Sequence, residues 1–193
     1  MTSARPPTIL CVDDEAGALT LRKLLLEQAG YIVLSAPDGA TALQLFKSQT
    51  INLVISDHLL PDLSGCELTR EMKRQRPFVP IMLFSGVTEP PAEAGHADSF
   101  TCKGDGPDEL LAKVADLLRC NRISEGSYFA EIRCDKRFDP IVWHYTIQRL
   151  RSLEILAWSQ AASEKAAIQT AKGEMRRLNR ERRTREAAVK LQG

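Results

Sequence analysis

The chain has 193 residues, which is long enough for one full domain plus a smaller one, or for one domain plus a helical extension. Its 44% hydrophobic and 26% charged residues are ordinary for a soluble globular protein. It contains no run of eighteen apolar residues, and the short apolar run near the N-terminus leads directly into Asp13 and Asp14, so neither a transmembrane span nor a signal peptide is predicted and a cytoplasmic location is expected. The net charge of +1 combines −5 for residues 1–120 with +6 for residues 121–193, which suggests two parts with different partners.

Short apolar runs alternate with amphipathic segments through the first part. The runs that predict strands are residues 8–12, 31–35, 51–56, 79–84 and 97–102. The segments that predict helices are residues 16–29, 39–48, 63–75 and 107–119. Near-continuous apolar strands that alternate with helices form parallel sheets covered on both faces. Residues 7–120 are therefore expected to be a flavodoxin-like, doubly wound α/β domain with a five-stranded parallel sheet.

The connection between the fourth and fifth predicted strands is short and contains Pro90 and Pro91. Proline is tolerated only in the first turn of a helix, because it lacks an N–H group and its ring clashes with the preceding turn. We therefore expect the helix in this connection to be stunted or missing.

The pattern changes after residue 120. Residues 121–127 are polar and predict a linker. Residues 128–134 and 141–149 are rich in β-branched and aromatic residues, with apolar and polar positions alternating in the second run, which is typical of half-buried antiparallel strands. Residues 153–158 predict a third strand, and the composition from residue 159 onward favours a helix. We expect residues 128–193 to form a small α+β module, a three-stranded β-meander with a long helix and a basic helical tail.

Polar residues that can carry chemistry follow the carboxyl ends of the predicted parallel strands. They are Asp13, Asp14, Asp57, Ser85 and Lys103. In a doubly wound sheet, ligands bind outside these strand ends. Three carboxylates brought together repel one another and require a divalent cation, and a site rich in oxygen atoms suits Mg²⁺. A hydroxyl and an ammonium group would complete a site for a phosphoryl group on one carboxylate.

This set, together with the run at residues 57–61 (DHLLP) and Gly65, closely resembles the signature of receiver domains in two-component response regulators. The resemblance implies that Asp57 accepts a phosphoryl group from a sensor histidine kinase or a phosphotransfer protein, so the protein would be a phosphoacceptor switch and not an enzyme. It implies that Mg²⁺ is bound directly by Asp14, Asp57 and the backbone carbonyl of Leu59, with Asp13 acting mainly through water. Ser85 and Lys103 would contact the phosphate, and Phe100 would change rotamer on phosphorylation.

The sequence departs from the family pattern in two places. Gly104 follows the lysine where the family usually has proline, commonly with a cis peptide bond. A cis bond to a non-proline residue costs about 2.5–4 kcal/mol, so we expect this loop to be trans or more mobile. The stunted helix between the fourth and fifth predicted strands alters a surface that commonly mediates dimerisation or output in the family. A homodimer is therefore allowed, but without the usual geometry.

The output of the second part is open between three hypotheses. In the first, residues 128–193 bind a downstream protein, and phosphorylation of Asp57 changes their exposure. In the second, they bind nucleic acid through the tail, where residues 172–190 hold eight basic residues against three acidic ones. Interleaved glutamates and the absence of aromatic residues favour a solvated helix face there, so nucleic acid is not the favoured partner. In the third, the protein is a phosphate sink without output.

Overall fold

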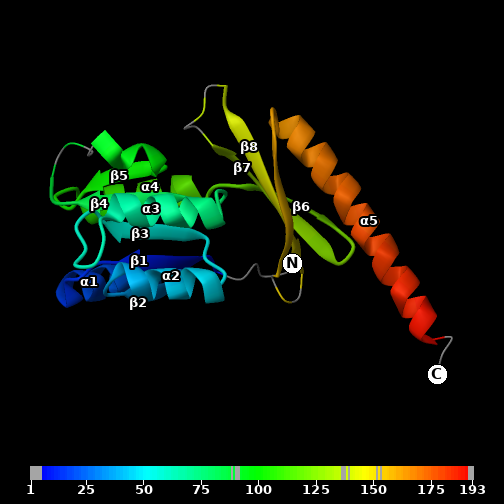
Figure 1. Cartoon of the computed structure of the whole chain (residues 1–193), viewed down its shortest axis with the longest axis horizontal. Coiled ribbons are helices and arrows are strands. Elements are labelled where there is room, and N and C mark those ends of the chain that lie inside the picture. The colour runs from blue at the N-terminus through cyan, green and yellow to red at the C-terminus, as the bar shows by residue number, and fades with distance from the viewer. Residues whose placement is uncertain are drawn as a thin grey trace. The chain divides into compact units, whose positions relative to one another are not determined.

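The computed structural model describes residues 6–87, 89, 92–135, 138, 140–150, 152 and 154–190. The chain divides into two compact units, Met1–Arg119 and Cys120–Gly193, and each unit has its own β-sheet (Figure 1). None of the described helices is long and apolar enough to cross a membrane.

The first unit is the doubly wound domain that the sequence predicts. Its sheet is parallel throughout, with the strand order β2-β1-β3-β4-β5. The strands are β1 (Thr8–Val12), β2 (Ile32–Ala36), β3 (Leu53–Asp57), β4 (Ile81–Ser85) and β5 (Ser99–Cys102). The helices are α1 (Ala16–Gln28), α2 (Gly39–Ser48), α3 (Gly65–Gln75) and α4 (Pro107–Leu118). The prediction of a flavodoxin-like fold is confirmed.

Two hydrophobic cores lie on the two faces of this sheet. α2 and α3 cover one face (Figure 1), where Leu10 and Val12 of β1 pack with residues of these helices. On the other, Ile9 and Cys11 pack with residues of α1 and α4. These four side chains are fully buried, which explains why residues 9–12 are apolar at every position and show no alternation.

The connection between β4 and β5 contains one short 3₁₀ turn, η1 (Ala92–His96), and no α-helix among the residues that the structure describes. The expectation of a stunted helix is therefore confirmed for these residues. Pro90 and Pro91, on which the expectation rested, lie outside the described residues.

The second unit is an antiparallel four-stranded sheet, in the order β6-β7-β8-β9, with one long helix. Its elements are β6 (Asn121–Glu125), β7 (Tyr128–Asp135), β8 (Val142–Arg149), β9 (Ile155–Ala161) and α5 (Glu164–Lys190). The prediction of a β-meander followed by a helix is confirmed, but the count of three strands is wrong.

The error concerns residues 121–127, which were expected to be a linker and instead form β6 and a tight turn. β6 is an edge strand of mainly polar residues, and only Ile123 joins the hydrophobic core. Gly126 has a φ of +63°, and with Ser127 it forms the two-residue connection to β7. A glycine in a two-residue loop is typical of a hairpin, whereas the polarity of the segment is typical of a linker.

The core of the second unit lies between the sheet and α5. Ala167, Ala171 and Met175 of the helix are fully buried against Ile132 of β7 and Ile147 of β8. A spacing of four residues puts these helical positions on one face, because an α-helix has 3.6 residues per turn. This face of α5 packs against the sheet.

Candidate functional site

Three carboxylates meet at the carboxyl edge of the first sheet. Asp13 and Asp14 follow β1, and Asp57 is the last residue of β3, which pairs directly with β1. One oxygen atom from each carboxylate can be chosen so that all lie within 4.8 Å of one another. Asp13 and Asp57 are buried and Asp14 is exposed. The structure thus brings together the three carboxylates that the sequence predicts.

Lys103 lies among these carboxylates. Its Nζ is 2.6 Å from Oδ2 of Asp57 and 3.1 Å from Oδ2 of Asp13. The backbone N–H of Lys103 donates to the carbonyl of Ser85, which fixes the loop after β5 beside the end of β4. Desolvation lowers the pKa of Lys103, but the bonds to Asp57 and Asp13 outweigh it and raise the pKa above its usual value. The ammonium group therefore stays charged next to Asp57.

Arg22 of α1 makes a buried ion pair with Asp13. Its Nη2 donates to Oδ2 of Asp13 at 2.9 Å, and the two side chains are 4% and 0% exposed. The guanidinium also lies over the Phe84 ring, 4.4 Å from its centroid. Burial raises the pKa of the Asp13 carboxyl, but hydrogen bonds from Arg22, from the Glu15 N–H and from Lys103 outweigh it and hold the pKa below its usual value.

Arg22 is the residue of the site that the sequence analysis missed. In α1, Leu21 and Leu24 are 70% and 54% exposed, whereas Arg22 is buried with Leu19 and Leu26. Positions 19, 22 and 26 are spaced by three and four residues, so they share one helix face. That spacing was the available signal, and it was hidden because an arginine between leucines looks like a solvated position.

Ser85 ends β4, the strand next to β3, with Asp57 paired to the preceding residue Phe84. Its side chain is buried, and its Oγ accepts the Val87 N–H at 3.3 Å. Phe100, on β5, is half-buried and lines a separate hollow of about 430 Å³. The structure thus places Ser85 at the edge that carries the carboxylates, and it places Phe100 beside that edge, facing a different cavity.

The loop after β3 is fitted closely to Asp57. The backbone N–H of Leu59 donates to Oδ1 of Asp57 at 3.3 Å, while the Leu59 side chain is exposed. Gly65 begins α3, and a Cβ atom at this position would overlap the backbone oxygen of Asp57. The glycine is therefore required by the close approach of α3 to the end of β3.

The donor atoms fit a hard divalent cation. All are oxygen atoms, and the three carboxylates carry one negative charge more than Lys103 and Arg22 together neutralise. The Asp14 carboxylate has no hydrogen bond among the described residues, and Oδ1 of Asp57 accepts only the Leu59 N–H. Both oxygens of Asp13 are already engaged by Arg22, Lys103 and the Glu15 N–H. Asp14 and Asp57 are thus the residues best prepared to ligate a metal directly.

Comparisons with known proteins agree with this geometry. The family model of the response regulator receiver domain matches residues 9–115, a range that contains every residue of the site. The alkaline phosphatase synthesis transcriptional regulatory protein PhoP of Bacillus subtilis is 33% identical over 139 residues, which are 69% of this chain and 57% of PhoP. The chain spans about half the length of the curated relatives it matches.

Solved structures are similar as well. The response regulator TrrA of Thermotoga maritima, determined in complex with Mg²⁺-BeF, is 33% identical with a TM-score of 0.56, and the match covers 57% of this chain and 98% of TrrA. The chemotaxis response regulator CheY4 of Vibrio cholerae is 28% identical with a TM-score of 0.55, covering 58% of this chain and 98% of CheY4.

Proposed function

Because the chain belongs to the response regulator receiver domain family, we propose that Asp57 accepts a phosphoryl group and that the protein acts as a phosphorylation switch. The observation that carries the proposal is the ion pair between Lys103 Nζ and Asp57 Oδ2, which lie 2.6 Å apart. Two further carboxylates lie beside this pair. Receiver domains take phosphoryl groups from sensor histidine kinases, so we propose such a kinase, or a phosphotransfer protein, as the donor.

We propose different roles for the two oxygens of Asp57. Oδ2 is held by the Lys103 ammonium, and Oδ1 accepts the Leu59 N–H. One of the two would attack phosphorus while the other ligates the metal. The attacking oxygen would form a bond to phosphorus as the P–N bond to the donor histidine breaks. The electron pair of that bond returns to the imidazole, which takes up a proton from water.

Lys103 and Ser85 would then hold the product. Once phosphorylated, the Asp57 carboxylate loses its own negative charge. The phosphoryl oxygens then take its place as the partner of the Lys103 ammonium. The Ser85 hydroxyl accepts a hydrogen bond from Val87 but donates none to the residues that the structure describes, so its proton is available to a phosphoryl oxygen.

The metal that we propose is Mg²⁺, held by Asp14, Asp57 and the backbone carbonyl of Leu59, with Asp13 acting through water. When bound, Mg²⁺ would neutralise the charge that develops on the phosphoryl oxygens. Asp13 is suited to an outer role because Arg22 and Lys103 already hold its oxygens. The chemistry is a single transfer onto the chain, so we propose a phosphoacceptor without turnover of a separate substrate.

The test is phosphorylation of the full chain by acetyl phosphate with Mg²⁺, followed by intact-mass measurement after an acid quench. We expect one added phosphate, and none in Asp57→Ala. Asp116→Asn, which changes an exposed carboxylate of α4, is the matched control and should be phosphorylated like the parent. An absent adduct in the parent, or an adduct that survives Asp57→Ala, would refute the proposal.

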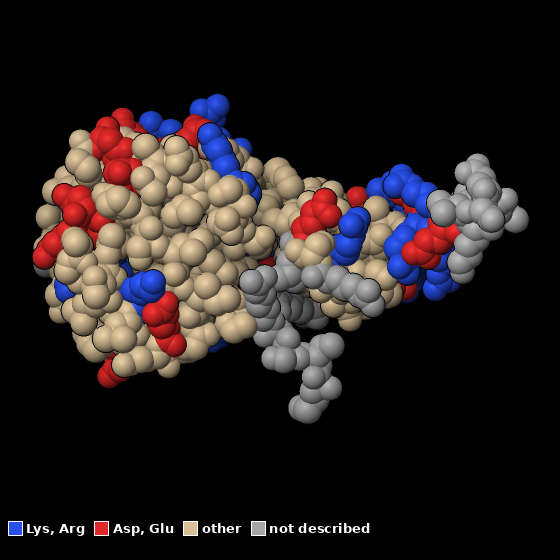
Figure 2. Space-filling model, turned by 90° about the horizontal axis from the view of Figure 1, so that it is seen from below, with Lys and Arg blue, Asp and Glu red and all other residues tan. Residues whose placement is uncertain are grey.

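For the output we propose a protein partner of the second unit, whose accessibility changes with Asp57 phosphorylation. Nucleic acid is the second candidate, because Arg180, Arg183 and Arg185 make no ion pair with the residues that the structure describes. Arg177 and Arg182, in contrast, pair with glutamates, and basic and acidic side chains lie together along the exposed end of α5 (Figure 2). DNA or RNA binding that weakens steeply with salt would favour nucleic acid. A phosphate sink predicts that deleting residues 121–193 leaves the pathway response intact.

A further inference from the structure

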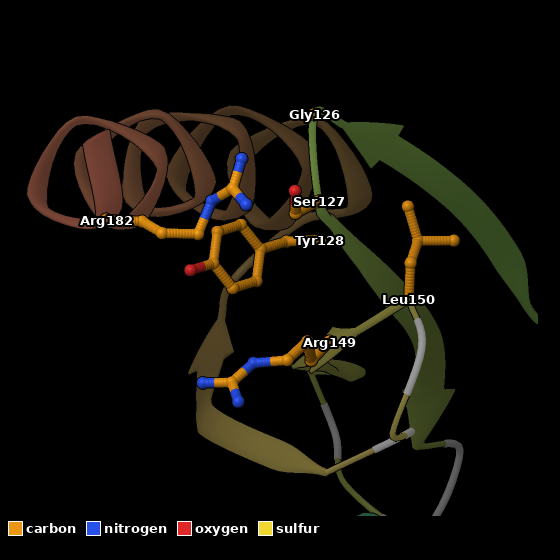
Figure 3. Close-up of a pocket in the computed structure, with 6 residues that line it drawn as sticks. All are labelled: Gly126, Ser127, Tyr128, Arg149, Leu150 and Arg182. Carbon is orange, nitrogen blue, oxygen red and sulfur yellow. The ribbon is translucent and has the colours of Figure 1, made fainter. Parts of the chain in front are cut away.

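The second unit contains a pocket of about 450 Å³ that no part of the proposed phosphorylation chemistry uses. Figure 3 shows the residues that line it, which are Gly126, Ser127, Tyr128, Arg149, Leu150 and Arg182. They come from the turn between β6 and β7, from the adjoining ends of β7 and β8, and from α5. Two arginines and two hydroxyl groups thus line one cavity, and no carboxylate is among the lining residues that the structure describes.

The two arginines are placed by fixed backbone elements. Arg149 pairs with Tyr128 across β7 and β8. On the helix side, Asn179 donates through Nδ2 to the Glu125 carbonyl at 2.8 Å and accepts the Ser127 N–H at 3.2 Å. These bonds tie α5 to the β6–β7 turn, and Arg182 lies three residues further along the same helix face.

The polar groups of the pocket retain hydrogen-bonding capacity. The Arg149 and Arg182 side chains are 49% and 45% exposed, and each makes one ion pair through Nη1, to Glu154 at 3.4 Å and to Glu186 at 3.1 Å. A guanidinium group has five N–H donors, so most donors of each arginine remain available.

Tyr128 adds a further hydrogen-bond donor. Its ring is buried and lies between the two arginine side chains (Figure 3). Its hydroxyl makes no hydrogen bond with the part of the chain that the structure describes. The pocket therefore offers two cations and a phenol hydroxyl.

We propose that this pocket binds a phosphate monoester of mononucleotide size. Paired guanidinium groups bind phosphate through charge-assisted, often bidentate hydrogen bonds. A terminal phosphate carries close to two negative charges at neutral pH, which matches two arginines better than the single charge of a phosphodiester within a nucleic-acid strand. The volume lies within the range of pockets for small ligands, so the cavity has room for the organic part of the ester as well as for the phosphate.

The test is isothermal titration of the full chain with AMP, adenosine, inorganic phosphate and a short single-stranded oligonucleotide without terminal phosphates. We expect AMP to bind at least about tenfold more tightly than adenosine, since a hydrogen bond between charged groups is worth about tenfold or more in affinity. Inorganic phosphate should compete with AMP. Failure of millimolar AMP and phosphate to bind would overturn the proposal.

Variants separate the pocket from the general charge of α5. Arg149→Gln and Arg182→Gln should each weaken AMP binding on the order of tenfold. Arg180→Gln is the matched control, because it removes the same charge from the same helix but does not line the pocket, and it should leave AMP binding unchanged. Equal losses in Arg180→Gln and Arg182→Gln, or an oligonucleotide that binds as tightly as AMP, would overturn the pocket in favour of strand binding along α5.

Two further variants test the role of individual groups without removing an arginine. Glu186→Gln frees Arg182 from its ion pair and should tighten AMP binding a few-fold. Tyr128→Phe keeps the buried ring, so the fold is retained, and should weaken the binding of AMP but not of adenosine. Unchanged AMP affinity in both variants would overturn the assignment of these groups to the ligand.

Discussion

The site in the first unit and the pocket in the second unit hold their charged groups in opposite ways. At the site, Asp13 and Arg22 form an ion pair out of contact with water, and Lys103 joins both Asp13 and Asp57. In the pocket, Arg149 and Arg182 are about half exposed, and each is paired with one exposed glutamate. Breaking a buried pair leaves an uncompensated charge in the protein interior, whereas an exposed pair is replaced by water at little cost.

This difference suits the two proposed roles. A phosphoacceptor has to be aligned before the donor arrives, so its neighbours gain from rigid, buried partners. In a pocket that exchanges a small ligand, the ligand has to displace the glutamates that pair with the arginines. Weak, exposed ion pairs allow this displacement. We therefore expect substitutions at the buried charges of the first site to change stability, and substitutions at the pocket to change binding with little effect on stability.

The largest effect is expected from Arg22→Met, which keeps the shape of the side chain but removes the guanidinium. Asp13 then stays buried with one partner fewer, and the free energy of unfolding in urea should fall by about 3–5 kcal/mol. Arg119→Met, which breaks an exposed pair with Asp116, is the control and should cost less than about 1 kcal/mol. Equal losses in the two variants would show that the buried pair stabilises the fold no more than an exposed pair does.

The next effect is expected at Gly65, where a Cβ atom would overlap the backbone oxygen of Asp57. Gly65→Ala should lower the free energy of unfolding by about 1–3 kcal/mol, the usual cost of overpacking, and should also slow phosphorylation of Asp57. Gly17→Ala is the matched control, because its Cβ would meet nothing closer than 3.9 Å within α1. Since alanine favours helix, this control should stabilise the protein by about 0.5–1 kcal/mol. A stable, rapidly phosphorylated Gly65→Ala protein would show that α3 can move away from the site.

How far the sequence alone leads also differs between the units. The parallel sheet and the five polar residues at its edge follow from local signals, because strand ends in a doubly wound fold converge by rule. Arg22 could not be predicted with the same ease, since its burial depends on the face that α1 presents to Asp13. Leu21 and Leu24 of the same helix are apolar, yet they are exposed.

In the second unit the local signals were weaker. An edge strand needs few apolar residues, so the sequence of β6 resembles that of a polar linker. Ile123 is its residue that packs against the core. The pocket was not predicted because Arg149 and Arg182 are far apart in sequence. They meet only through the pairing of β7 with β8 and the Asn179 contacts of α5.

A smaller effect is expected from pH at the first site. Because the pKa of Asp13 is lower in the folded protein than in the unfolded chain, ionised Asp13 stabilises the fold above the unfolded pKa. This contribution is lost as pH falls through the folded pKa, in the region below about 4. The difference in unfolding free energy between the parent and Asp13→Asn should therefore shrink from pH 5 to pH 2. A constant difference over this range would mean that Asp13 does not couple to folding through its charge.

The smallest effect on stability is expected at the pocket. Arg182→Gln breaks one exposed pair, so the free energy of unfolding should change by less than about 1 kcal/mol, and 0.5 M salt should reduce the change further. The same variant should lose AMP binding on the order of tenfold. Arg22→Met should show the reverse, a large loss of stability with unchanged AMP affinity, because the two residues belong to separate units. If Arg182→Gln instead destabilised the protein as Arg22→Met does, the arginine would be a structural partner of α5, and the contrast between a rigid switch and an exchangeable pocket would fail.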